Sequence, residues 1–421
     1  MRRSEIIDNS RMVFASYDLR LIVQSMYFIA LARIFGPDKY GAFIGIIAII
    51  SLFLPFANWG SSKILIQNVS RDQSLIGECY GTSILKTLVF GSIFISIVLF
   101  ISVLYPIPNI SIYSAFLLSL SNFIFMVLSD NCRDTFISVG LINCASKVTL
   151  MLSVNRFLGA LALIAFTRTP TLLMWSVVYC MATFVTAVTS SIMASNLVGR
   201  PRFKPFRIFK DLRQGFAFSV SDSAENIYND LDKAMLAKLS TVESVAIYGA
   251  AYHLLNVSFL PMQAIMLATY RGFFQAGASG IKASLGFAKK IVPIALGYST
   301  LAIILTLLLS PLIPKLLGEG YVDSTLALML LSPTILFKSL HRLAADILTG
   351  ANYQRVRSVA QVFTALFNGI LNIWLIALYQ WRGAIWSTLI SECLLMIILW
   401  GFIYVYCQKS QENLVPVSHK K

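Results

Sequence analysis

Four polar side chains share one face of a single apolar segment, and three of them are acidic. With 100° between successive residues of a helix, Asp222, Glu225, Asn229 and Asp232 fall in one narrow sector, and the opposite side is apolar. Carboxyl groups that are removed from water bind protons more readily, so this face could take up and release a coupling ion. The candidate coupling acids are Asp222, Glu225, Asp230, Asp232 and Glu392.

Basic residues interrupt several other apolar segments. One Arg or Lys at the centre of a spanning helix costs about 2.5–3.5 kcal/mol, so it should face an interior or water. Arg20 shares a helical face with Gln24 and Tyr27, and Lys338, Arg342 and Asp346 recur every four residues. Arginine can donate two parallel hydrogen bonds to a phosphate. The candidate substrate-binding cations are Arg20, Lys86, Arg156, Lys233, Lys338 and Arg342.

Two interpretations of these charges stay open. They could line a hydrated cavity that attracts an anionic head group, with the acids serving as ion-coupling groups. Alternatively, they could pair with each other as structural ion pairs, or extend along the helices to the membrane surface.

The elements that must position these residues are long apolar helices. The chain of 421 residues is 57% hydrophobic and 13% charged, whereas soluble domains carry about 25% charged residues. A spanning helix needs roughly 20 apolar residues, and a membrane barrel would show alternating segments of about 10 residues. The apolar runs here are continuous. We therefore predict an all-α membrane protein with about twelve transmembrane helices and no soluble domain of any size.

The predicted helices divide into two sets of six. We place them at residues 12–35, 41–60, 79–105, 112–129, 148–166 and 172–196, and at 212–236, 246–270, 291–313, 325–347, 356–379 and 384–407. The expected domains are an N-terminal bundle (1–198), a basic cytoplasmic linker (199–214), a C-terminal bundle (215–407) and a cytoplasmic tail (408–421). We expect a pseudo-two-fold axis along the membrane normal and a central cavity.

Charge topology supports the helix at 212–236, which a hydropathy window alone would discard. With both termini cytoplasmic, most of the 34 basic residues fall on the cytoplasmic side, as the positive-inside rule requires. Without this helix, the later basic loops would lie outside. The linker itself, GRPRFKPFRIFKDLRQG, combines basic and aromatic residues. It is either a topology anchor or a surface that recognises a phosphate-bearing lipid.

The net charge of +15 does not indicate nucleic-acid binding, because the basic residues lie at helix ends. The six cysteines form no close-spaced pairs and the three histidines are scattered, so we expect neither a metal site nor a disulfide framework. The sequence contains no phosphate-binding loop or dinucleotide fingerprint. We therefore predict no cofactor.

An internal repeat and two hairpins carry a family resemblance. Leu31-Ala32-Arg33, Tyr40-Gly41 and Pro55 recur in order as Leu236-Ala237-Lys238, Tyr248-Gly249 and Pro261. The first hairpin, ALARIFGPDKYGAF, and the later NDLDKAMLAKLSTVESVAIYGAAYHL resemble the polysaccharide flippases, the O-antigen and exopolysaccharide branch of the multidrug/oligosaccharidyl-lipid/polysaccharide exporter superfamily. The matching residues are Arg33, Gly36, Pro37, Tyr40, Gly41, Gly60, Asp232, Tyr248 and Ala251. Ala246 departs from the family pattern, which has glycine there.

The resemblance implies a transporter of the bacterial inner membrane and not an enzyme. Such a protein would flip an undecaprenyl-diphosphate-linked oligosaccharide to the periplasmic leaflet for O-antigen, capsule or exopolysaccharide assembly. The mechanism would be alternating access with antiport of an ion, H⁺ or Na⁺. The implied partners are the lipid-linked oligosaccharide, membrane lipids, the coupling ion and the polysaccharide polymerase machinery.

Two other functions remain as alternatives. A multidrug exporter of the same superfamily should have an acidic, more apolar cavity, against which Arg20, Lys86 and Arg156 argue. A membrane-embedded polysaccharide polymerase usually needs a large extramembrane loop, and the longest predicted connections here are about twenty residues.

Overall fold

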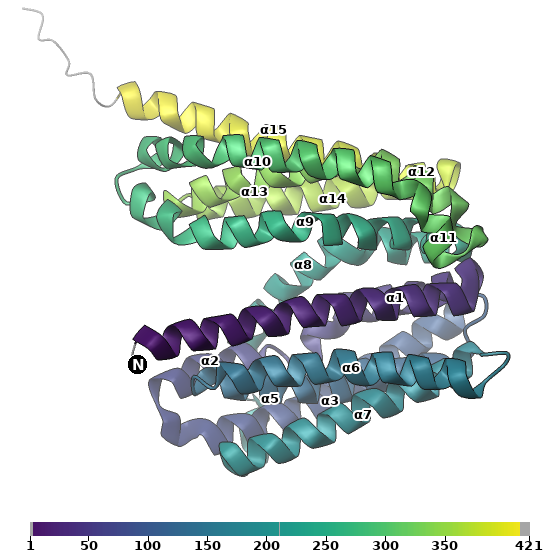
Figure 1. The fold of residues 1–421 in the computed structure, drawn as a ribbon. Helices are drawn as coiled ribbons and strands as arrows, with labels where there is room; N and C mark the ends of the chain where they lie inside the picture. Colours follow the sequence, from purple (N-terminus) through teal and green to yellow (C-terminus); the bar gives the residue numbers. More distant parts are fainter. Residues whose placement is uncertain (1–2, 210, 413–421) are drawn as a thin grey trace, which may run out of the picture. The chain divides into compact units, whose positions relative to one another are not determined.

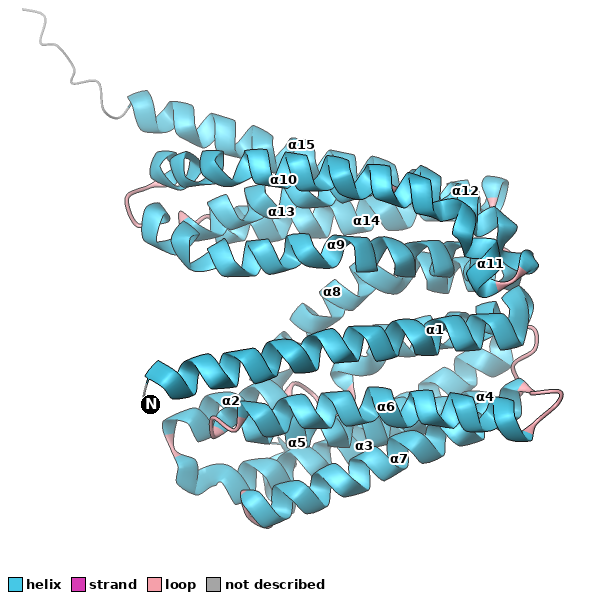
Figure 2. Ribbon diagram, viewed as in Figure 1, coloured by secondary structure: helices cyan, strands magenta, loops and turns pink. Residues whose placement is uncertain are grey.

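The computed structural model describes the backbone of residues 3–209 and 211–412, and the side chains of most of these residues. Every regular element in this part of the chain is a helix (Figure 2). The chain forms two compact units, Met1–Lys238 and Leu239–Lys421, and each is described by itself. This division groups the helix predicted at 212–236 with the first unit. The domain boundaries at 198 and 215 stay a prediction.

The first unit begins with the long helix α1 and ends with α8 (Figure 1). Its elements are α1 (Arg3–Phe53), η1 (Leu54–Phe56), α2 (Ser61–Arg71), η2 (Gln73–Leu75), α3 (Ile76–Leu104), α4 (Ile112–Leu120), the π-helical turn η3 (Ser121–Met126), α5 (Val127–Ser138), α6 (Ile142–Phe166), α7 (Leu172–Leu197), η4 (Pro205–Phe209) and α8 (Leu212–Leu239). Within this unit α1 packs on α6, and α6 packs on α7.

The second unit consists of helices packed around a core of α9, α10, α13 and α15. Its elements are α9 (Val242–Gly277), α10 (Ile281–Leu309), η5 (Ser310–Leu312), α11 (Ile313–Leu317), η6 (Glu319–Tyr321), α12 (Val322–Leu331), α13 (Thr334–Gly350), α14 (Gln354–Tyr379) and α15 (Trp381–Glu412).

The apolar segments account for about twelve spans. Nine segments of the described chain are long and apolar enough to cross a membrane, and a tenth counts if Glu319–Leu331 and Thr334–Gly350 form one bent span. The first segment, Ile22–Arg71, has 50 residues, which is more than twice the roughly 20 that one span needs. Gly36, at φ 65° and followed by Pro37, breaks α1 inside it, so it holds the two predicted helices. This count leaves out α8, whose acidic residues lower its hydropathy. With α8 added, the chain has about twelve spans, and the predicted fold class is confirmed.

The structure corrects the sequence prediction in two places. The helix predicted to end at residue 129 continues through η3 into α5 and ends at Ser138. Asn122 in the π-helical turn donates a side-chain hydrogen bond to the Leu118 carbonyl at 2.7 Å. The residues after Gly60, which we assigned to a loop, form the short helix α2. Both errors have one cause: the segments are polar, and hydropathy ends a helix where charges begin.

A close backbone contact holds the start of α8 to the first unit. The Trp59 indole donates to the Leu212 carbonyl at 3.0 Å, and a Cβ atom on Gly215 would lie 2.2 Å from the Trp59 carbonyl oxygen. Gly60, which has a left-handed φ of 63°, meets Gly215 from the other side. Only glycine fits at this contact because the two backbones touch.

We therefore predict that Gly215→Ala destabilises the protein. The added methyl group has to displace backbone, and overpacking of this kind costs about 1–3 kcal/mol. The matched control is Gly286→Ala, where a Cβ atom meets nothing within 4 Å, and where better helix propensity should leave stability unchanged or raised. Thermal unfolding of the two purified variants in detergent measures the difference. Equal midpoints would contradict the close contact.

Candidate functional site

Arg156 lies near the middle of α6, and its side chain contacts α7. Its guanidinium carbon lies 4.1 Å from the centre of the Tyr179 ring, a cation–π distance. Its nitrogens lie 3.4 Å from the Thr183 hydroxyl oxygen. The Tyr179 hydroxyl in turn donates to the Asn122 side-chain carbonyl at 3.1 Å. These contacts orient the positive charge at membrane depth, in the helix where the sequence predicted it.

Two acids and a second arginine lie together on α5, and one of these acids, Asp130, is within electrostatic reach of Arg156. The Arg133 guanidinium contacts Asp130 at 2.5 Å and Asp134 at 3.0 Å. Arg20 and Arg156 both lie close enough to act electrostatically on the Asp130 carboxylate. We call these five residues, Arg20, Arg133, Arg156, Asp130 and Asp134, the arginine cluster. These five residues carry three positive and two negative formal charges.

The arginine cluster is partly exposed. The side chains of Arg133 and Asp130 are 33% and 32% exposed, whereas Asp134 is buried. Tyr27, predicted to share the face of Arg20, lies 5.8 Å from Trp175 between ring centres and within electrostatic reach of Arg156. Aromatic side chains therefore border the charges on one side.

The sequence prediction missed the α5 part of the cluster. Asp130, Arg133 and Asp134 were assigned to a cytoplasmic flank because the helix was ended at residue 129. The spacing of Asp130 and Arg133, three residues apart, is typical of an ion pair on one helical face and is the signal that could have extended the helix.

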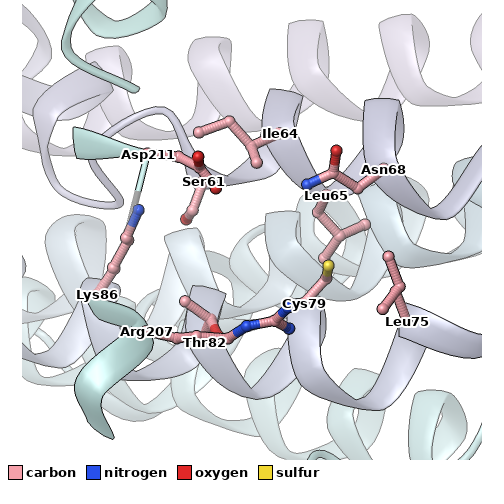
Figure 3. Close-up of a pocket in the computed structure, with 10 residues that line it drawn as sticks. All are labelled: Ser61, Ile64, Leu65, Asn68, Leu75, Cys79, Thr82, Lys86, Arg207 and Asp211. Atoms are coloured by element: carbon pink, nitrogen blue, oxygen red, sulfur yellow. The ribbon is translucent and has the colours of Figure 1, made fainter. Parts of the chain in front are cut away.

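Lys86 lies elsewhere in the first unit. Its side chain, only 2% exposed, reaches a cavity of about 150 Å³ between α2, α3 and the linker, where Arg207 and Asp211 also line the wall (Figure 3). The structure thus assigns Lys86 to this pocket and Arg20 and Arg156 to the arginine cluster. Sequence could not separate them, because the direction of each side chain depends on helix packing.

The charged residues of α8 divide into three groups. Lys233 donates to the Asp230 carboxylate, and the Ser51 hydroxyl donates to the same carboxylate at 2.8 Å. For Asp230 and Lys233 the structure therefore contains an ion pair, the structural alternative stated above. Asp232 is buried, with 6% exposure. The side chains of Asp222 and Glu225 lie outside the described residues.

The second unit holds a buried cluster of ionisable groups on three helices. On α13, the Lys338 amine donates to the Tyr252 hydroxyl of α9 at 2.9 Å and lies 3.8 Å from the Glu392 carboxylate of α15. The Nε2 atom of His341 lies 2.8 Å from the same carboxylate. Lys338, His341 and Glu392 are 8%, 5% and 2% exposed. We call Tyr252, Lys338, His341 and Glu392 the Lys338–Glu392 cluster.

Sequence analysis identified Lys338 and Glu392 as candidates and passed over His341. Both Lys338 and His341 face Glu392 because they are three residues apart on α13. Arg342, the other cation of that helix, is exposed, whereas Asp346 is buried. The row of Lys338, Arg342 and Asp346 therefore does not share one environment.

Comparison with solved structures defines the fold of the protein. The inward-facing conformation of a multidrug resistance MATE family transporter of the MOP superfamily aligns with a TM-score of 0.74 at 15% identity, covering 96% of this chain and 100% of that one. The lipid II flippase MurJ aligns with a TM-score of 0.68 at 14% identity, covering 94% and 87%. A MOP superfamily transporter from Pyrococcus furiosus aligns with a TM-score of 0.61 at 15% identity, covering 95% and 96%. The fold is that of the MOP superfamily transporters.

Residues 7–270 match the family described as polysaccharide biosynthesis protein. The chain belongs to this family, and the predicted resemblance to the polysaccharide flippases is confirmed. A search of curated proteins found no match. The protein is thus a multi-pass membrane protein of this family, with the fold of the MOP superfamily transporters.

Proposed function

We propose that the protein flips an undecaprenyl-diphosphate-linked oligosaccharide across the bacterial inner membrane by alternating access. The observation that carries this proposal is the arginine cluster, which brings three guanidinium groups together with two carboxylates in a partly exposed position. A diphosphate is the part of such a substrate that most resists transfer through hydrocarbon. A site with several guanidinium groups lowers that cost by donating hydrogen bonds to the phosphate oxygens.

The chemistry of the cluster suits a diphosphate better than an organic cation. Guanidinium groups bind phosphate oxygens through two parallel hydrogen bonds, and Arg156 is pre-oriented by Tyr179 and Thr183. A cationic drug offers these guanidinium groups no anionic acceptor. The family membership adds the polysaccharide context, and MurJ, which shares the fold, is described as a lipid II flippase.

We further propose that ion coupling takes place in the second unit. Glu392 is an acid buried among Lys338, His341 and Tyr252, so binding or loss of one proton there changes the net charge of a closed environment. We propose that this cluster holds the coupling proton. Asp232 on α8 is retained as a second candidate acid because it is buried.

The remaining parts of the proposal concern location and partners. The bias of basic residues supports a cytoplasmic location for both termini. Delivery of the glycan to the periplasmic leaflet would make the polysaccharide polymerase machinery the next component to act on it.

Transport of a labelled substrate in proteoliposomes tests the proposal. The protein is reconstituted with a fluorescent undecaprenyl-diphosphate oligosaccharide, and an impermeant quencher reports the fraction that reaches the outer leaflet. We expect the inner pool to become quenchable with the protein and to stay protected in empty liposomes. Efflux of a cationic dye from the same liposomes, with no movement of the lipid-linked glycan, would instead favour the drug-exporter alternative.

A further inference from the structure

Asn122 is a buried polar residue that contacts Tyr179, the aromatic partner of Arg156. It lies in the π-helical turn η3 and is 4% exposed. Its amide nitrogen donates to the Leu118 carbonyl at 2.7 Å, and its side-chain oxygen accepts from the Tyr179 hydroxyl at 3.1 Å. Because the donor end of the amide is held by backbone, the acceptor end has a fixed direction toward Tyr179.

Three groups hold the Tyr179 side chain, which is 3% exposed. The ring centres of Trp175 and Phe43 lie 5.8 and 5.9 Å from its own, both edge to face. Asn122 holds the hydroxyl. Apolar contacts allow a ring to slide, whereas a hydrogen bond has a preferred distance and angle. Asn122 therefore fixes where the ring lies beneath the guanidinium of Arg156, whose central carbon is 4.1 Å from the ring centre.

The Tyr179 ring is the main constraint on the plane of that guanidinium. Its Nε and Nη2 atoms each lie 3.4 Å from the Thr183 hydroxyl oxygen, which is longer than the usual range of about 2.7–3.2 Å. The Thr183 hydroxyl donates its own proton to the Tyr179 carbonyl at 2.7 Å. The Nη2 atom also lies 3.5 Å from the Met126 sulfur, at the end of η3. These polar contacts are weak, so the stacking determines the orientation.

One edge of the Arg156 guanidinium is left for a ligand. A guanidinium has five N–H groups in a fixed planar arrangement, two of them on Nη1. In the part of the chain that the structure describes, no residue accepts a hydrogen bond from Nη1. The side chain is partly exposed. A planar group that is held at one face and at the opposite edge presents its remaining edge in one direction, as recognition of a phosphate requires.

We propose that Asn122 is a positioning residue of the transport site and acts through Tyr179 on Arg156. By holding the ring in place, Asn122 keeps the Nη1 edge of Arg156 directed at the diphosphate of the substrate. This inference rests on the proposed function. It gives an uncharged, buried residue a part in the binding of an anion that it does not touch.

Transport kinetics in proteoliposomes test the inference through a double-mutant cycle. Asn122→Ala should raise the substrate concentration for half-maximal transport about 3- to 10-fold, the effect of one hydrogen bond, and should leave the maximal rate nearly unchanged. Tyr179→Phe, which removes only the hydroxyl, should do the same. In an Arg156→Ala background neither substitution should have a further effect. The matched control is Asn372→Ala, which removes a buried, hydrogen-bonded asparagine of the second unit and should leave the half-maximal concentration unchanged.

Two results would overturn the positioning role. If Asn122→Ala has its full effect in the Arg156→Ala background, Asn122 does not act through Arg156. If Asn122→Ala lowers the maximal rate and leaves the half-maximal concentration unchanged, its role is structural, because a less stable protein only reduces the number of active molecules. Tyr179→Phe decides the question if Asn122→Ala fails to fold, since the ring and its packing are retained.

Binding of inorganic diphosphate distinguishes a failure of this inference from a failure of the proposed function. The rise in the unfolding temperature of the detergent-solubilised protein with added diphosphate measures binding. If the wild-type protein moves no glycan lipid but binds diphosphate more tightly than Asn122→Ala does, the proposed function is wrong and the positioning role stands. If glycan lipid is transported with equal half-maximal concentrations in both proteins, the positioning role is wrong and the function stands. A wild-type protein that neither transports nor binds diphosphate would contradict both.

Discussion

Replacing Arg156 with alanine is expected to lower glycan-lipid transport by roughly 10- to 100-fold, because a hydrogen bond to a charged group contributes about 1.5–3 kcal/mol. The guanidinium is oriented by the Tyr179 ring and the Thr183 hydroxyl, so its loss removes a pre-organised phosphate contact. The measurement is the rate of quencher accessibility in proteoliposomes, at equal amounts of reconstituted protein.

Two further variants make this prediction specific. Arg156→Lys keeps the charge and loses the planar fork, so we expect an intermediate rate. Arg382→Ala removes an arginine that also stacks on an aromatic ring, at 4.5 Å from Trp381, but that is exposed on the second unit. That control should transport normally. If Arg156→Ala and Arg382→Ala behave alike, the arginine cluster does not bind the substrate.

The second large effect is expected at the Lys338–Glu392 cluster. Glu392→Gln leaves Lys338 buried without its carboxylate, and breaking a buried ion pair costs about 3–5 kcal/mol. Replacing both residues by apolar ones of similar size, as in Lys338→Met with Glu392→Leu, should recover most of this loss, because no uncompensated charge remains. Thermal unfolding in detergent measures the loss of stability in Glu392→Gln and its recovery in the double variant.

Transport as a function of the proton gradient then separates stability from coupling. If Glu392 holds the coupling proton, the double variant should be stable and should lose its response to an imposed gradient. A double variant that is stable and still responds to the gradient would reduce this cluster to a structural role. Asp232 would then be the remaining candidate acid for the coupling proton.

Most of the fold could be predicted because hydrocarbon imposes one simple requirement. Backbone groups must be paired within each span, so the lengths of the apolar runs locate the helices. Even α8 was placed, although its acids conceal it from a hydropathy test, because the distribution of basic loops requires a span there. Gly36 and Pro37 likewise marked the break in α1 from sequence alone.

The site was predicted less well, for a different physical reason. A charge within a span must face something polar, but the sequence does not say which neighbour. Lys86 and Arg156 are equivalent in hydropathy, and packing directs one to the linker pocket and the other to Tyr179. Asp130 and Arg133 were missed because their own polarity ended the predicted helix. His341 acquires its importance only from Glu392 on another helix.

The π-helical turn at Ser121–Met126 joins an apolar helix, α4, to a charged one, α5. Such a turn accommodates an extra residue, and each residue of an α-helix advances the chain by about 100° around the axis. The insertion therefore turns Asp130 about the helix axis relative to the residues of α4. Without that offset, the same amino acids would cross the same thickness of hydrocarbon with their carboxylates aimed at a different neighbour.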